Sequence, residues 1–179
     1  MVLERTTLIP ASIEKVFAFF ADPRNLGRLT PPWLGFTIVS APGPELRQHD
    51  EIEYRIRLLG IPVRWVTQIV SWHHGRSFED LQQKGPYAFW LHLHEFEEVD
   101  GGVRMRDRVE YRVPMGAIGW FFTGWWVGPR LQRVFDYRTT AIAEVFPGAR
   151  EEAGHRSKVK AGEAGCGRGG TETEMENVE

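Results

Sequence analysis

The sequence is poor in the features that mark several protein classes. It contains one cysteine, Cys166, among 179 residues, and that cysteine lies in a glycine-rich stretch. This speaks against a disulfide scaffold, a cysteine-based zinc site and a packed catalytic thiol. No run approaches the roughly 20 apolar residues of a membrane-spanning helix. The first residues show no basic segment followed by an apolar one, as a secretory signal would. We therefore expect a cytoplasmic protein without a transmembrane segment.

Charge of one sign is also scarce. The net charge is −2, from 22 basic and 24 acidic residues that alternate along the chain. Without a basic stripe, a nucleic-acid partner is not expected. Hydrophobic residues make up 42% of the chain, which is typical of a globular protein. After Pro147 large apolar residues almost disappear, which predicts one domain over residues 1–147 and a disordered tail over 148–179.

The most informative pattern lies between residues 78 and 113. Three segments, 78–83, 90–97 and 103–112, alternate between charged and apolar residues with the period of two that is typical of half-buried strands. Each segment also places polar side chains on its apolar face. These inward-facing polar residues are Asp80, Gln82, His92, His94 and Asp107.

The turn between the last two of these segments predicts their register. Asp100-Gly101 is a strong signal for a two-residue hairpin, and such a hairpin places His94 opposite Asp107. Opposed side chains on one face have Cβ atoms about 5 Å apart, so a His94–Asp107 hydrogen bond is feasible. The preceding loop is less determinate, and Asp80 is expected opposite either His92 or Trp90.

The remaining pattern predicts an α+β architecture. A strand at 2–8 precedes two short helices, the first after Ser12 and the second starting at Asp22-Pro23. Further strands are expected at 36–40, 51–58 and 63–72. Leu131, Val134, Phe135, Arg138, Ile142 and Val145 recur at helical spacing and predict a long C-terminal helix. An antiparallel sheet bent around that single helix would leave a cavity between them.

A segment rich in tryptophan and glycine, residues 118–126, precedes the long helix. Its glycines loosen the backbone, which favours a lid over the cavity. Two alternatives remain open: the rings cap the core, or they contact a membrane or a partner.

Three stretches of the sequence resemble the START-like or SRPBCC superfamily, which includes polyketide cyclases and dehydratases and coenzyme-Q-binding proteins. They read PASIEKVFAFFADPRNLGRLTP, FEDLQQKGPYAFWLHLHEF and MRDRVEYRVP. The chain is similar to a bacterial subgroup whose relatives occur fused to nucleotide-sugar epimerase-like proteins, although no epimerase motif is present here. The resemblance implies a helix-grip fold, in which a seven-stranded antiparallel sheet wraps around the C-terminal helix and encloses a hydrophobic ligand cavity. Because the superfamily includes binders, transfer proteins and enzymes, it does not assign a reaction.

Four interpretations of the inward-facing polar residues remain open. They form internal pairs that fix the sheet register, or they are the polar end of a ligand pocket. A His–Asp dyad acts as general acid or base on a substrate, or His92, His94 and an aspartate bind a metal. The first two are favoured, so neither a metal nor a cofactor is expected.

The leading hypothesis is an intracellular binding protein for a hydrophobic small molecule, such as a lipid, a quinone or a polyketide-like compound. One alternative is a cyclase or dehydratase with His94 and Asp107 as catalytic residues. The other is an interaction module, with peripheral membrane contact left open, and the sequence does not indicate an oligomeric state. The expected ligand-binding residues are Tyr54, Trp65, Thr67, Asp80, Trp90, His92, His94, Asp107, Tyr111, Trp125 and Phe135.

Overall fold

A computed structural model describes residues 1–114 and 126–152 of the chain. The segment expected as a lid therefore lies outside the described residues, apart from Trp126. The strands are β1 (Val2–Ile9), β2 (Thr37–Ser40), β3 (Glu51–Leu58), β4 (Ile61–His73), β5 (Ser77–Lys84), β6 (Phe89–Val99), β7 (Gly102–Arg112) and β8 (Arg150–Glu151). The helices are α1 (Ile13–Ala21), α2 (Leu26–Leu29) and α4 (Gly128–Val145), with 3₁₀ turns η1 (Pro23–Asn25) and η2 (Pro32–Leu34).

The strands form one antiparallel sheet in the order β2-β3-β4-β5-β6-β7-β1-β8. Strands β2 to β7 follow one another as neighbours, as their short connections predict, and β1 pairs with β7. Beyond the seven expected strands, β8 pairs with Thr7 and Leu8 of β1. The sheet thus continues past Pro147, where composition predicted that the folded part ends.

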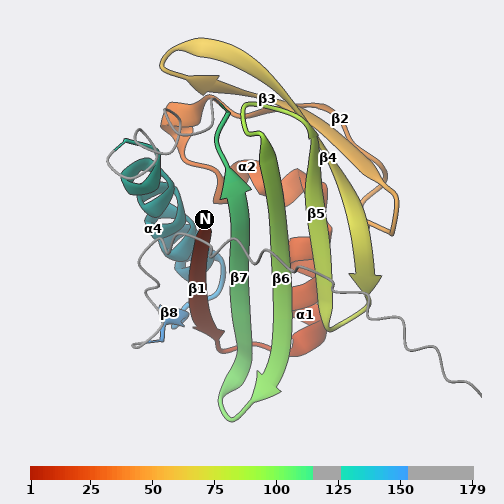
Figure 1. The fold of residues 1–179 in the computed structure, drawn as a ribbon. Coiled ribbons are helices and arrows are strands. Elements are labelled where there is room, and N and C mark those ends of the chain that lie inside the picture. The colour runs from red at the N-terminus through yellow and green to blue at the C-terminus, as the bar shows by residue number, and fades with distance from the viewer. Residues whose placement is uncertain (115–125, 153–179) are drawn as a thin grey trace, which may run out of the picture.

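Local signals position the helices on one side of this sheet. The side chain of Asp22 accepts a hydrogen bond from the Arg24 backbone nitrogen at 3.0 Å and caps η1, as its position before a proline predicts. Ser12 stands at the N-cap of α1 without a side-chain cap bond. In Figure 1, α1 and α2 lie behind β5 and β6, and α4 lies beside β1. The helices therefore cover the concave face of the curved sheet.

Two irregularities help the sheet to curve. The register between β4 and β5 shifts between Val66 and Thr67 and again between Ile69 and Ser71. Such bulges bend a strand and increase its twist. Together with the helices on the concave face, this confirms an α+β helix-grip fold. None of the described helices is both long and apolar enough to cross a bilayer.

The interior contains two hydrophobic clusters. One lies under α1 and includes Phe17, Phe20 and Phe78. The other lies between α4 and the sheet and includes Trp65 and Phe135. The side chains of His92 and His94 lie between the two clusters, because one ring contacts Phe135 and the other contacts Phe78.

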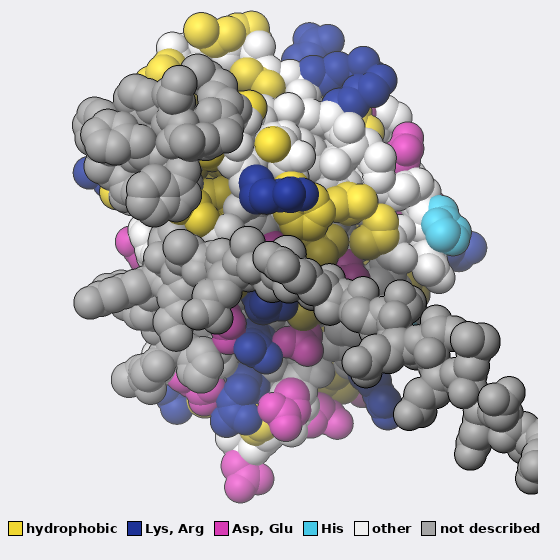
Figure 2. All heavy atoms as spheres, viewed as in Figure 1, with side chains coloured by type: hydrophobic (Ala, Val, Ile, Leu, Met, Phe, Trp, Pro, Cys, Tyr) yellow, Lys and Arg dark blue, Asp and Glu magenta, His cyan; other side chains and the backbone are white. Residues whose placement is uncertain are grey.

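The outer face of the sheet carries charges of both signs, which Figure 2 shows interleaved over its lower part. Arg106 contacts Glu4 at 2.6 Å and Glu95 at 3.3 Å, and Arg104 contacts Glu97 at 3.2 Å. The pairs with Glu95 and Glu97 are exposed, and exposed pairs contribute little to stability. Their main effect is to define which face of each strand is exposed to solvent.

The hairpin that fixes the β6–β7 register depends on Gly102, which has φ +142°. A Cβ at this position would overlap the Ile9 carbonyl oxygen and lie 2.8 Å from Pro10 Cα. We expect Gly102→Ala to lower the free energy of unfolding by about 2–4 kcal/mol. Urea denaturation of the variant and the wild type would measure this difference in the free energy of unfolding.

The matched control is Gly43→Ala, because a Cβ there meets nothing within 4 Å. Its effect should stay within about 0.5 kcal/mol. Equal stability of the two variants would show that the close approach at Gly102 does not constrain the hairpin.

Candidate functional site: a polar cluster on a cavity wall

Strand register brings the polar residues together. His94 pairs with Asp107 across β6 and β7, which confirms the register predicted from the Asp100-Gly101 turn. Asp80 pairs with His92 across β5 and β6, one of the two positions left open. Gln82, the fifth inward-facing polar residue, instead donates to the Tyr87 carbonyl oxygen at 2.8 Å and holds the β5–β6 loop.

Asp107 is the central acceptor of the cluster. Its Oδ1 lies 2.8 Å from His94 Nδ1 and 3.1 Å from His92 Nε2. Arg138 on α4 donates through Nε to Oδ2 at 3.0 Å and through Nη2 to Oδ1 at 3.3 Å. One buried carboxylate thus receives hydrogen bonds from both imidazoles of β6 and from the helix that crosses the sheet.

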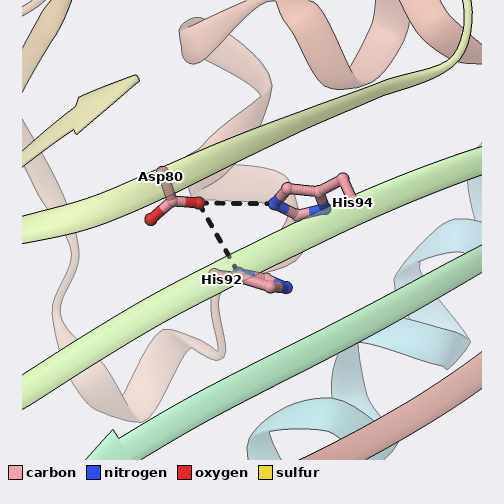
Figure 3. Close-up of side chains that lie close together, drawn as sticks. All are labelled: Asp80, His92 and His94. Atoms are coloured by element: carbon pink, nitrogen blue, oxygen red, sulfur yellow. Dashed lines mark ion pairs between the residues drawn. The ribbon is translucent and has the colours of Figure 1, made fainter. Parts of the chain in front are cut away.

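Asp80 lies on the opposite side of the two rings. Its Oδ1 accepts a hydrogen bond from Thr67 Oγ1 at 2.9 Å. Its Oδ2 faces His94 Nε2 at 3.4 Å and His92 Nδ1 at 3.7 Å, as Figure 3 shows. The ring centroids of the two histidines are 3.9 Å apart. Each ring therefore directs one nitrogen to Asp107 and the other to Asp80.

Burial and charge separate the pKa values in this cluster. Burial opposes ionisation of Asp107, but the charge of Arg138 and the bonds from both imidazoles hold its pKa well below the ordinary value. Burial also opposes ionisation of Asp80, yet His94, His92 and Thr67 lower its pKa. Burial and the neighbouring His94 lower the pKa of His92. For His94, contacts with both carboxylates outweigh burial and raise the pKa.

These directions describe a balanced cluster. The two buried carboxylates face the guanidinium of Arg138 and the two imidazoles, so each carboxylate has a cationic or hydrogen-bonding partner. This pairing is what a low-dielectric interior requires, since an uncompensated buried charge is costly.

The cluster borders a cavity of about 1160 Å³ between the sheet and α4. This volume lies slightly above the usual range for small-molecule sites, about 300–1,000 Å³. Asp80, His92, His94 and Arg138 line one part of it, and the rest of the lining is mainly aromatic and aliphatic. Two lining residues are strongly exposed, Trp33 at 60% and Leu59 at 69%, and they mark its mouth.

Most of the expected ligand-binding residues line this cavity: Tyr54, Trp65, Thr67, Asp80, Trp90, His92, His94 and Phe135. Asp107 and Tyr111 do not line it. Asp107 contacts His92 Nε2 and His94 Nδ1, the imidazole nitrogens that face away from Asp80. Tyr111 is fully buried beside Trp90. Trp125 lies outside the described residues.

Arg138 is the site residue that sequence reasoning did not assign. It lines the cavity, bonds to Asp107, and its guanidinium lies 5.3 Å from the Phe20 ring centroid. The available signal was its position on the apolar stripe of the long helix. A charge at such a position either extends to solvent along its methylenes or has a buried partner.

Three groups of the cluster could hold a metal ion. One ligand atom each from Asp80, His92 and His94 lies within 4.8 Å of the other two. Asp107 contacts the imidazole nitrogens that face away from this point.

Fold and site together define a helix-grip domain with an internal cavity and one buried polar patch. The profile of the family described as polyketide cyclase / dehydrase and lipid transport matches residues 2–146, and the chain belongs to this family. The resemblance to the SRPBCC superfamily is thereby confirmed. A comparison with curated protein sequences found no match.

Solved structures share the fold. Protein TTHA0849 of Thermus thermophilus superposes with a TM-score of 0.60 at 17% identity, over 80% of this chain and 95% of its own. Protein Ms6760 of Mycobacterium smegmatis has a TM-score of 0.59 at 18% sequence identity, and the match covers 80% of this chain and 89% of Ms6760. A nucleoside-diphosphate sugar epimerase of Corynebacterium glutamicum has a TM-score of 0.57 at 24% identity, and the match covers 79% of this chain and 28% of the epimerase. At these identities the likeness concerns the fold alone.

Removing the guanidinium should expose the dependence of the fold on this cluster. In Arg138→Met the Asp107 carboxylate loses its strongest charge partner while it stays buried. We expect the free energy of unfolding to fall by about 3–5 kcal/mol, as for other broken buried pairs. Urea denaturation followed by circular dichroism would measure the loss.

Arg133→Met is the matched control, because Arg133 is exposed on the same helix. It should change stability by no more than about 0.5 kcal/mol. A similar small loss in both variants would mean that Asp107 is satisfied without Arg138.

Proposed function

We propose that this chain binds an apolar small molecule, such as a lipid, a quinone or a polyketide-like compound, in the cavity between the sheet and α4. The observation that carries the proposal is the cavity of about 1160 Å³ whose mainly apolar wall contains one buried polar patch. Membership of a family described by cyclisation, dehydration and lipid transport supports a ligand-binding role.

The arrangement of the lining also suggests how the ligand is oriented. His92 and His94 are only 8% and 5% exposed, whereas Trp33 and Leu59 at the mouth are largely exposed. We infer that a hydroxyl, carbonyl or quinone oxygen points inward to the polar patch. The apolar body would then contact the aromatic wall near Trp65, where burial supplies most of the affinity.

Filling the cavity tests this proposal. Val134 lines the cavity from α4, so Val134→Trp should reduce the affinity for a fluorescent fatty acid at least tenfold. Fluorescence titration would measure the affinity. Native mass spectrometry of the mildly extracted wild-type protein would identify a co-purifying compound.

Thr140→Trp is the matched control, since Thr140 is exposed on the same helix and does not line the cavity. It should bind like the wild type. Equal affinity in both tryptophan variants, or no uptake of a fatty acid, a quinone or an aromatic polyketide by the wild type, would refute the proposal.

A cyclase or dehydratase activity is the second candidate. The 2.8 Å contact between His94 Nδ1 and Asp107 Oδ1 favours it, because a carboxylate that orients an imidazole is a common arrangement in acid–base catalysis. Here His94→Gln should abolish turnover of a polyketide substrate, while fatty-acid uptake stays within threefold of the wild type. Parallel loss of turnover, uptake and stability would assign His94 a structural role instead.

The interaction-module alternative and the cytoplasmic location stay predictions. The assignment of a disordered tail stays a prediction for residues 153–179, whereas Arg150 and Glu151 form β8.

A further inference from the structure

Three potential ligand atoms converge where the polar cluster borders the cavity. Asp80 Oδ2 lies 3.4 Å from His94 Nε2 and 3.7 Å from His92 Nδ1. Both distances exceed the usual N–H···O range of about 2.7–3.2 Å. They are close to the separation of about 3.4 Å between two ligands of a tetrahedral ion with bonds of about 2.0–2.1 Å. Both spacings are therefore compatible with a shared cation, and all three atoms lie within 4.8 Å of one another.

Asp107 determines which nitrogens are free to bind. It is an anion held by Arg138, so it accepts the N–H of His94 Nδ1 and of His92 Nε2. In a neutral imidazole only one nitrogen carries hydrogen. The remaining lone pairs, on His94 Nε2 and His92 Nδ1, both face the carboxylate of Asp80 (Figure 3).

A proton on one imidazole bridges only one of the two contacts with Asp80, whereas a metal ion bridges all three groups. We propose that Asp80, His92 and His94 bind a divalent first-row transition metal ion, with Asp107 as the hydrogen-bond partner that orients both imidazoles.

The surroundings agree with such a site. Two imidazoles and one carboxylate form a ligand set typical of zinc and of non-haem iron. An outer carboxylate on each ligating histidine is the usual support of such centres, and Asp107 supplies it to both rings. Thr67 holds the other oxygen of Asp80, which leaves Oδ2 for the ion.

The open coordination positions would face the cavity, because all three proposed ligands line it. An oxygen donor of a bound compound, or water, would fill them. The metal site itself does not depend on the proposed ligand-binding function, since metal alone tests it.

The experiment uses the full chain, stripped with a chelator and titrated with Zn²⁺ and with Co²⁺. We expect one ion per chain by elemental analysis after gel filtration, and a visible Co²⁺ absorption band of a four- or five-coordinate site. Thermal unfolding should shift upward by about 5–10 °C at a hundredfold excess of Zn²⁺ over its Kd.

Variants connect the signal to the proposed ligands. Asp80→Asn and His92→Gln should each lower the Zn²⁺ affinity at least a hundredfold and remove the Co²⁺ band. Asp107→Asn should lower the affinity about 10–100-fold, as outer-partner substitutions do. Circular dichroism would verify the fold of each variant, and two independent ligand variants keep the test decisive if one does not fold.

His155→Gln/Cys166→Ser and His73→Gln/His74→Gln are the controls, because they remove other metal-binding side chains. Both should bind Zn²⁺ like the wild type. The proposal is overturned if the folded ligand variants bind as tightly as the wild type, or if the wild type shows neither stoichiometric uptake nor a thermal shift. An ion on His94 Nε2 would also exclude that nitrogen as a free base, so stoichiometric uptake argues against the acid–base candidate.

Discussion

The buried carboxylate of Asp107 is the constraint on which the site depends. It receives hydrogen bonds from His92 and His94 on one neighbouring strand and from Arg138 on α4. Burying a carboxylate is costly unless its lone pairs accept hydrogen bonds. The β6–β7 hairpin and α4 must therefore be correctly placed at the same time for Asp107 to be satisfied. The same contacts set the orientation of both imidazoles. A structural requirement and the chemistry of the cavity wall are thus met by the same atoms.

The cluster also explains why the interior is hollow at this point. It lies between the phenylalanine-rich core under α1 and the aromatic wall under α4, with His94 against Phe78 and His92 against Phe135. Apolar side chains that closed over it would desolvate every polar atom not already bonded. A cavity beside the cluster leaves room for water or for a polar group of a bound compound.

Sequence alternation predicted much of this arrangement. Polar residues on the apolar faces of three segments identified Asp80, His92, His94 and Asp107, and the hairpin signal gave the register. Alternation along a strand predicts which face a side chain lies on, but not how far it lies from the cavity. The sequence therefore could not show that Asp107 and Tyr111 lie behind the residues that line the cavity. Arg138 was ambiguous because a long side chain on an apolar stripe reaches either solvent or a buried acid. The two-residue pairing of β8 leaves no pattern in the sequence that a strand prediction could use.

The sheet ends in two very short strands. β2 has four residues and β8 has two, whereas the strands between them have eight to thirteen. Very short edge strands are one of the devices by which sheets avoid edge-to-edge aggregation. The pairing of β8 covers Thr7 and Leu8 of β1. If the cavity binds an apolar compound as proposed, short edge strands limit the backbone available for strand pairing while the apolar lining is exposed.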